Sequence, residues 1–253
     1  MAIPRLREYP GPALLSYGFR PFFLLGALYS GLSVMVWMPQ FYGELQLATH
    51  FAPVDWHVHE LFFGYLAAVV TGFLFTAVPN WTGRMPIQGT PLLVLLLIWI
   101  GGRFAVTFSA VLGWVPAMAV DLAFLAAIAM VIGKEIVAGR NWRNLKVLAP
   151  LLLLLAANTC FHLEVHFAGS SDYSRRLAMA AAITLIMLIG GRIIPSFTRN
   201  WLARENPGRL PISFNYFDRF SLAAGIAALA AWVIEPVGVP ATTLMGLAAL
   251  VHL

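Results

Sequence analysis

Long apolar segments alternate with short polar ones along the whole chain. Eight segments stand out, at residues 21–39, 61–79, 91–112, 115–133, 147–167, 177–195, 220–235 and 238–253. A helix of about 20 apolar residues crosses the roughly 30 Å hydrocarbon core of a bilayer. Prolines or glycines stand near most segment boundaries, where helices begin or end. The pattern predicts an all-α, polytopic transmembrane helical bundle with about eight spans, and hence the lipid bilayer as its surroundings.

The composition agrees with this class. Of the 253 residues, 60% are hydrophobic and only 11% are charged, whereas about a quarter of the residues in a soluble domain are charged. The net charge of +5 would suggest nucleic acid as a partner of a soluble protein. Here the basic residues lie between apolar segments, so they indicate membrane topology and no nucleic-acid partner. Cys160 is the only cysteine, which excludes an intrachain disulfide and a cysteine-ligated iron–sulfur cluster.

The basic residues divide unevenly between the two sets of alternate loops. One set holds thirteen of the sixteen: Arg5, Arg7, Arg20, Arg84, Lys134, Arg140, Arg143, Lys146, Arg192, Arg199, Arg204, Arg209 and Arg219. The opposite set holds only Arg175 and Arg176. Because basic loops stay in the cytoplasm, we expect a cytoplasmic N-terminus, with residues 1–20 as an uncleaved cytoplasmic tail. Residues 40–60 and 168–176 then face outward, and residues 1–253 form a single integral membrane domain.

This topology brings histidines together at the outer face. His57 and His59 precede the segment 61–79 at its outer end, and His162 and His166 close the segment 147–167 at its outer end. His50 lies in the outer loop as well, so five of the six histidines share one side. Histidine is the commonest metal ligand and a usual axial ligand of haem. The convergence favours a metal or cofactor site; the simpler alternative is a set of interfacial polar residues that join helix ends.

Helical spacing separates the two histidines of the sequence "WHVHE". His57 and His59 are two residues apart and therefore lie on opposite sides of a helix, with Asp55 as a plausible N-cap residue before them. Glu60 lies nearer the His57 side. His57 is expected above a stripe of small residues, which permits close approach of another helix or a flat ligand; the stripe is Gly64, Ala68 and Gly72. His59 projects over the bulkier side of Phe63, Leu66 and Val70, so His57 is the favoured ligand and His59 the second.

The other histidine pair has a different spacing. His162 and His166 stand at i and i+4 on one helix face, and Asn158 extends that face by one turn. Two imidazoles at this spacing can bind the same metal ion. The sequence "HLEVH" does not have the glutamate position of a zinc protease, and Glu164 is expected at the outer interface.

Two charged residues lie inside apolar segments. Arg103 and Asp121 stand about nine and six residues from the outer turn of the hairpin 91–133, so their depths differ by about 4–5 Å. An unpaired charge at this depth costs several kcal/mol, and an ion pair between neighbouring helices is expected. Such a pair can simply fix helix packing; the functional alternatives are a clamp for an anionic group and a proton route.

A short sequence recurs at the end of two apolar segments. "VPNWT" (78–82) and "IPSFT" (194–198) are each followed by an arginine, and both segments run from outside to inside. We expect the proline to stop each helix. The recurrence fits a parallel duplication of a four-helix unit, as some transporters show, although a match this short also arises by chance.

Five motifs, taken together, resemble the NnrS family: "SYGFRPFF" (16–23), "WHVHELFFG" (56–64), "AVPNWTGR" (77–84), "NWRNL" (141–145) and "LIGGRIIPSFTRN" (188–200). The resemblance implies a polytopic protein of the bacterial inner membrane that contains haem b and copper and is linked to nitric oxide and denitrification stress. It implies about twelve transmembrane helices in the full protein, of which this chain supplies about eight as an N-terminal part. It carries over His57, His59 and Glu60 of "WHVHE" and also His162, whereas His166 rests on spacing alone.

The function expected from the residues and the resemblance is therefore a haem- and copper-binding membrane protein that responds to nitric oxide. Outer histidines would ligate haem iron and copper, while the resemblance assigns no catalysed reaction. The first alternative is a transporter or channel for a metal or a small solute, favoured by the recurring sequence and by the Arg103 and Asp121 charges. The second is a scaffold for another metalloprotein that binds no cofactor itself.

Overall fold

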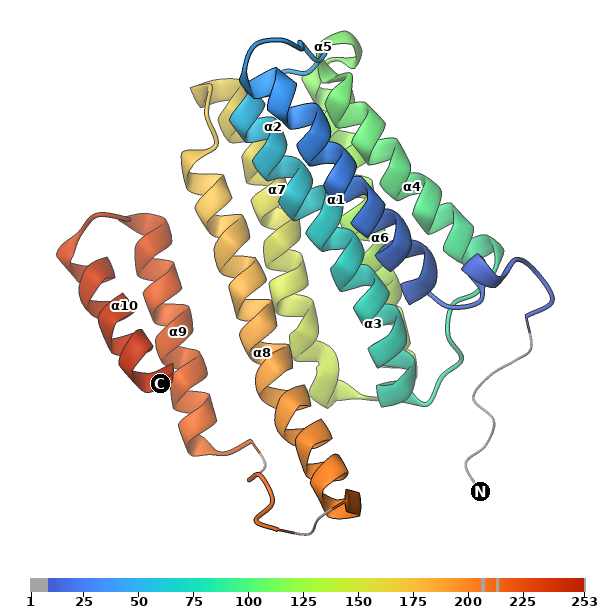
Figure 1. Ribbon diagram of the computed structural model, residues 1–253, viewed down its shortest axis with the longest axis vertical. Coiled ribbons are helices and arrows are strands. Elements are labelled where there is room, and N and C mark those ends of the chain that lie inside the picture. Colours follow the sequence, from blue (N-terminus) through green and yellow to red (C-terminus); the bar gives the residue numbers. More distant parts are fainter. Residues whose placement is uncertain (1–8, 206–207, 213, 253) are drawn as a thin grey trace. The chain divides into compact units, whose positions relative to one another are not determined.

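The computed structural model describes residues 9–205, 208–212 and 214–252, and this part of the chain is helical and free of strands (Figure 1). The prediction of a polytopic helical bundle is confirmed, with seven helices long and apolar enough to cross a membrane. Five of these spans are single helices: α1 (Phe19–Phe41), α4 (Thr90–Thr107), α6 (Trp114–Ala138), α8 (Asp172–Glu205) and α9 (Tyr216–Ile234). The second span begins with α2 (Pro53–His59) and the fifth with η3 (Trp142–Val147). The last predicted segment is the shorter α10 (Val239–His252).

Two of these spans are composite. The second consists of α2, the π-helical segment η2 (Glu60–Leu66) and α3 (Ala67–Thr82). The fifth joins the 3-10 turn η3 to α7 (Leu148–Ala168). A π-helix is rare and is frequently found at functional sites, and η2 follows directly on the "WHVHE" sequence.

The chain divides into two compact units, residues 1–175 and 176–253. In the second unit, Leu229 and Val233 of α9 form a small core with Ala180 of α8, and Met187 and Trp232 pack against it. Arg176 Nε donates a hydrogen bond to the Val233 carbonyl at 3.3 Å. The prediction of a single membrane domain built by duplication stays a prediction.

The first unit is built around α6, which packs against α3, α4 and α7. The buried side chains of α6 include Phe124, Leu125, Ile128, Ile132 and Ile136. This spacing of three and four residues forms a continuous apolar face. Asp121 stands on the same helix, so the fold carries this carboxylate into the interior of the unit.

The small-residue stripe of the second span packs against α1. Gly26 of α1 faces Ala68, where a Cβ on the glycine would lie 3.1 Å from the Ala68 Cβ. A Cβ on Gly72 would lie 2.7 Å from the Phe23 ring. The sequence predicts that this stripe admits either another helix or a flat ligand. The structure has the helix, because α1 covers the stripe.

The second span does not begin as predicted. Its first helix starts at Pro53 after Ala52 as N-cap residue, without a side-chain cap. Asp55 lies in the first turn and its carboxylate accepts a hydrogen bond from Ser171 Oγ. The N-cap prediction for Asp55 is therefore wrong, because proline is itself well suited to the first turn of a helix.

The two prolines of the recurring sequence do not stop their helices. Pro79 lies inside α3, which ends after Thr82 where Gly83 adopts a left-handed conformation (φ 71°). Pro195 lies inside α8, which continues to Glu205. The prediction fails because a proline inside a helix removes one hydrogen bond and commonly kinks the helix without ending it, and membrane helices tolerate this.

The N-terminal tail is only partly described. Arg5 and Arg7, on which the cytoplasmic assignment partly rests, lie outside the described residues. Further along, the Ser16 carbonyl accepts a hydrogen bond from Gln88 Nε2 at 2.7 Å, and the Leu15 carbonyl accepts one from the Gly89 amide at 3.0 Å. The tail is thus joined to the loop after α3, and both belong to the side that the basic residues assign to the cytoplasm.

Candidate metal centre

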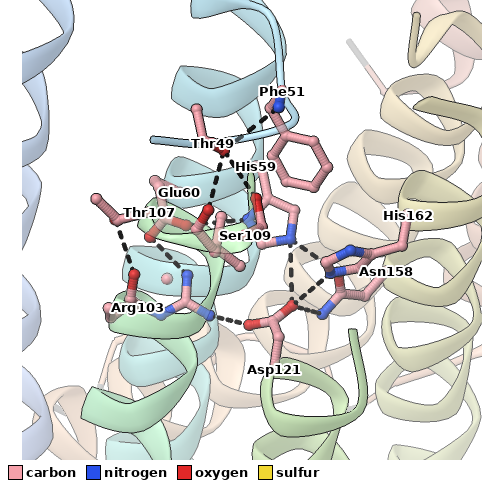
Figure 2. A network of polar contacts seen from close by, with 12 residues as sticks. Thr49, Phe51, His59, Glu60, Arg103, Thr107, Ser109, Asp121, Asn158 and His162 are labelled. Atoms are coloured by element: carbon pink, nitrogen blue, oxygen red, sulfur yellow. Dashed lines mark hydrogen bonds and ion pairs between the residues drawn. The ribbon is translucent and has the colours of Figure 1, made fainter. Parts of the chain in front are cut away.

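Three buried side chains from three different spans come together inside the first unit. His59 ends α2, Asp121 lies on α6 and His162 lies on α7. Each offers one ligand atom, and these atoms lie within 4.8 Å of one another. Figure 2 shows the two imidazoles pointing at the same carboxylate oxygen. The group is one that can hold a metal ion.

The distances in this group suit a small ion. Asp121 Oδ2 lies 3.2 Å from His59 Nε2 and 3.1 Å from His162 Nε2. Ligand atoms about 2.0–2.1 Å from a tetrahedral ion are about 3.3 Å apart. Asn158 supplies a further oxygen, since its Oδ1 lies 3.0 Å from His59 Nε2. The same atoms form hydrogen bonds when no ion lies between them, and Asn158 Nδ2 donates one to Asp121 Oδ2 at 2.8 Å.

An ion pair network adjoins the three ligands. Arg103 Nη2 donates to Asp121 Oδ1, so the ion pair predicted from the sequence is present, and Arg103 Nη1 donates to Glu60 Oε2 at 2.6 Å. Glu60 also accepts from the Tyr29 hydroxyl, and its Oε1 lies 3.1 Å from His59 Nδ1. Two carboxylates against one guanidinium leave one negative charge. A buried charge must be balanced, and either a proton on an imidazole or a metal cation can do so.

Aromatic rings enclose the group. The His59 ring has Phe51 and Phe63 at centroid distances of 5.0 Å and Phe161 at 5.3 Å. Phe51 also lies 5.3 Å from the ring of His162. Such a shell excludes water and strengthens electrostatic interactions. It fits an ion, and the three phenyl rings packed on His59 leave no space for a macrocycle against that imidazole.

The other two predicted ligands lie outside this group. His57 stacks on Trp37 of α1 with ring centroids 4.0 Å apart. Its Nδ1 is buried and has no hydrogen-bond partner among the described residues. His166 is exposed and stacks on Trp114 at 4.1 Å. Opposite helix faces thus separate His57 from His59 as expected, but the face of His59 is the one that reaches Asp121 and His162.

A polar cavity adjoins the group on the side of His162. It has a volume of about 240 Å³ and is lined by His50, Phe51, Ser109, Trp114, His162, Val165 and His166. Three histidines of the predicted outer side therefore share one cavity. Its wall is fixed by Ser109, whose Oγ accepts a hydrogen bond from the His50 amide at 2.9 Å. His162 thus lines a cavity, whereas His59 is fully enclosed.

Sequence reasoning missed two contributors to this site. Tyr29 donates to Glu60, and its only sequence signal is a phenolic hydroxyl in the middle of the first apolar segment. The π-helical segment η2 gave no sequence signal at all. Asn158 was placed on the His162 face by spacing, but without a partner.

Comparison with known proteins identifies one family. The chain matches the family described as "NnrS protein" over residues 13–253. Searches of the curated proteins and of the solved structures gave no match. The matched range contains each residue of the candidate metal centre.

Proposed function

Because this chain belongs to the NnrS family, we propose that it is a metal-dependent protein of the bacterial inner membrane that acts in the response to nitric oxide and denitrification stress. The observation that supports this proposal is the buried group of His59, Asp121 and His162, whose ligand atoms lie within 4.8 Å of one another. Nitric oxide is the small-molecule ligand that we propose.

Copper is the metal that we propose for this group. Imidazole nitrogens bind Cu²⁺ more tightly than the other divalent ions of the first row, and a carboxylate completes a mixed N and O donor set. The two carboxylate oxygens of Asp121 have different partners. Oδ1 accepts a hydrogen bond from Arg103, and Oδ2 lies against the two imidazoles. Arg103 thereby holds the carboxylate in place, as groups behind metal ligands commonly do.

Haem requires a different residue. Phenyl rings enclose the imidazole of His59, and the Nε2 atoms of His59 and His162 both lie against the Asp121 carboxylate, so we propose His57 as the haem ligand. Its Nδ1 has no partner among the described residues, and stacking on Trp37 fixes the plane of its ring. Copper and haem iron both bind nitric oxide, which is the chemistry that these groups would supply.

Metal analysis of the purified protein tests the proposal. We expect about one copper per chain in the wild type and a loss of at least tenfold in affinity for His162→Ala, since a missing ligand or supporting partner costs this much or more. His166→Ala is the matched control, four residues along the same helix and outside the group. Equal copper in both variants, or none in the wild type, would contradict the proposal.

A transporter for a metal or a small solute is the second candidate. It is favoured by the ionisable residues buried within membrane-spanning helices, which commonly mark substrate or ion pathways. A colourless protein that carries metal across liposome membranes would support this candidate. A coloured protein without transport would support the first.

A further inference from the structure

Four histidines of the first unit differ in burial, from its surface to its interior. His50 and His166 are exposed, His162 is 4% exposed, and His59 is fully buried. The first three line the polar cavity beside the metal group. The Nε2 atoms of His162 and His59 lie 3.1 and 3.2 Å from the same oxygen, Asp121 Oδ2. Of the three proposed ligands, His162 is therefore the one that lines the cavity.

The two exposed histidines have fixed positions at the cavity wall. His166 stands one turn after His162 on α7, and its ring stacks on Trp114 with the centroids 4.1 Å apart. The His50 amide donates a hydrogen bond to Ser109 Oγ at 2.9 Å. Neither histidine belongs to the group whose ligand atoms are close enough to hold an ion. Their imidazoles thus offer ligand nitrogens beside the metal group without being part of its ligand set.

The charges favour movement of a cation from the cavity to the metal group. Among the described residues that line the cavity there is no carboxylate, so imidazole and hydroxyl groups are its polar donors. In the metal group, Asp121 and Glu60 stand against the single guanidinium of Arg103, which leaves one negative charge. A cation in the cavity is attracted by this charge. It must also lose bound water, which is costly unless ligands such as neutral imidazoles replace that water.

From these observations we propose that His50 and His166 form an entry route for the copper ion, which binds their imidazoles briefly before it reaches His162. The proposal rests on the proposed metal function, because it needs an ion that comes to rest beside Asp121. Each step exchanges one water or imidazole nitrogen for another on the same Cu²⁺, without electron transfer. An entry route changes how fast the ion moves and leaves the affinity of the filled group unchanged. Release of the ion follows the same route in reverse.

The proposal is tested on the full chain in nanodiscs, stripped of metal with a chelator and reloaded with Cu²⁺. Copper retained after rapid gel filtration gives the rate constant of loading, and its loss to excess EDTA gives that of release. In the chain with both His50→Ala and His166→Ala, we expect both rate constants to fall about tenfold, which corresponds to about 1.4 kcal/mol in the barrier. Their ratio, and hence the dissociation constant, should stay that of the wild type. His252→Ala is the matched control, because His252 is exposed and lies in the second unit.

The alternatives give different results in the same experiment. If the cavity is only a passage, removal of two imidazoles widens it, and loading is as fast as in the wild type or faster. This result overturns the entry route and leaves the metal function standing. A weaker affinity, with release as fast as before or faster, would make His50 and His166 ligands of the bound ion and also overturns the entry route. A wild-type chain that holds no copper overturns the entry route and the proposed function together.

Discussion

Asp121 is the residue at which the ion pair and the candidate metal ligands meet. One carboxylate oxygen accepts from Arg103, and the other lies within 3.2 Å of Asn158 Nδ2, His162 Nε2 and His59 Nε2. These partners come from three different spans. A single carboxylate therefore joins helices that the chain places far apart in sequence, and it shares the charge of Arg103 with Glu60.

The first prediction concerns this carboxylate. Asp121→Asn keeps the shape of the side chain but removes its charge, which leaves Arg103 with Glu60 alone. Glu60 still balances the charge of Arg103, so the cost is that of the lost charged hydrogen bonds, about 1–3 kcal/mol of stability, and we expect copper retention to fall together with the unfolding temperature. Chelator competition and thermal unfolding in detergent measure both. Asp172→Asn is the control, since that carboxylate forms an exposed pair with Arg175, and exposed pairs contribute little.

The second prediction separates the two histidines of "WHVHE". His59→Ala removes one buried ligand and should abolish copper binding, whereas His57→Ala should leave copper unchanged and lower the haem absorbance. The reason is that His59 lies against Asp121 while His57 stacks on Trp37 on the α1 side. Metal analysis and optical spectra of both purified variants give the answer. A loss of copper in His57→Ala alone would reverse the assignment.

At the scale of elements, the π-helical segment η2 brings both Glu60 and Gly64 against Arg103. A Cβ on Gly64 would lie 2.8 Å from Arg103 Nη1, 2.9 Å from Glu60 Oε2 and 3.0 Å from the Tyr29 ring. The carbonyl of Gly64 also accepts a hydrogen bond from Trp99 Nε1 at 3.0 Å. The absence of a side chain at this one position lets α1, α4 and the second span converge on the arginine.

The third prediction follows from this close approach. Gly64→Ala should push Arg103 and Glu60 apart, lower the stability by about 1–3 kcal/mol, as overpacking commonly does, and weaken copper binding through Asp121. Gly31→Ala on α1 is the matched control, because nothing lies within 4 Å of a Cβ there. Denaturation and metal retention of the two variants test it. Equal stability of both would show that the network has room to move.

The sequence predicted the elements and faces better than their partners. The apolar pattern located the spans, and a period of 3.6 residues placed His57 and His59 on opposite faces, as the structure has them. It could not show that α1 covers the small-residue stripe or that α6 brings Asp121 to the other face, because these are contacts between distant segments. The ranking of His57 above His59 relied on small residues as space for a ligand, and that space is occupied by a helix.

At the scale of the whole molecule, the candidate chemistry lies within the first unit, near the end of the bundle that holds the loop 42–52. This loop is joined to the hairpin of α4 and α6, since Thr49 Oγ1 donates to the Val106 carbonyl at 2.9 Å and the Ala110 amide donates to the Ala48 carbonyl at 2.9 Å. The attachment fixes His50 and Phe51 over the metal group. The direction from which the proposed metal and nitric oxide would reach His162 thus depends on which membrane side this end faces.

The fourth prediction tests that orientation. The distribution of arginine and lysine assigns the loop holding Glu44 to the periplasm and the loop holding Arg84 to the cytoplasm. Cys160 is the only native cysteine, so Cys160→Ser gives a background into which Glu44→Cys or Arg84→Cys is introduced. A membrane-impermeant maleimide should label the Glu44→Cys chain in intact cells and the Arg84→Cys chain only after permeabilisation. The reverse pattern would turn the cavity of His50, His162 and His166 toward the cytoplasm, and metal would then be acquired from inside the cell.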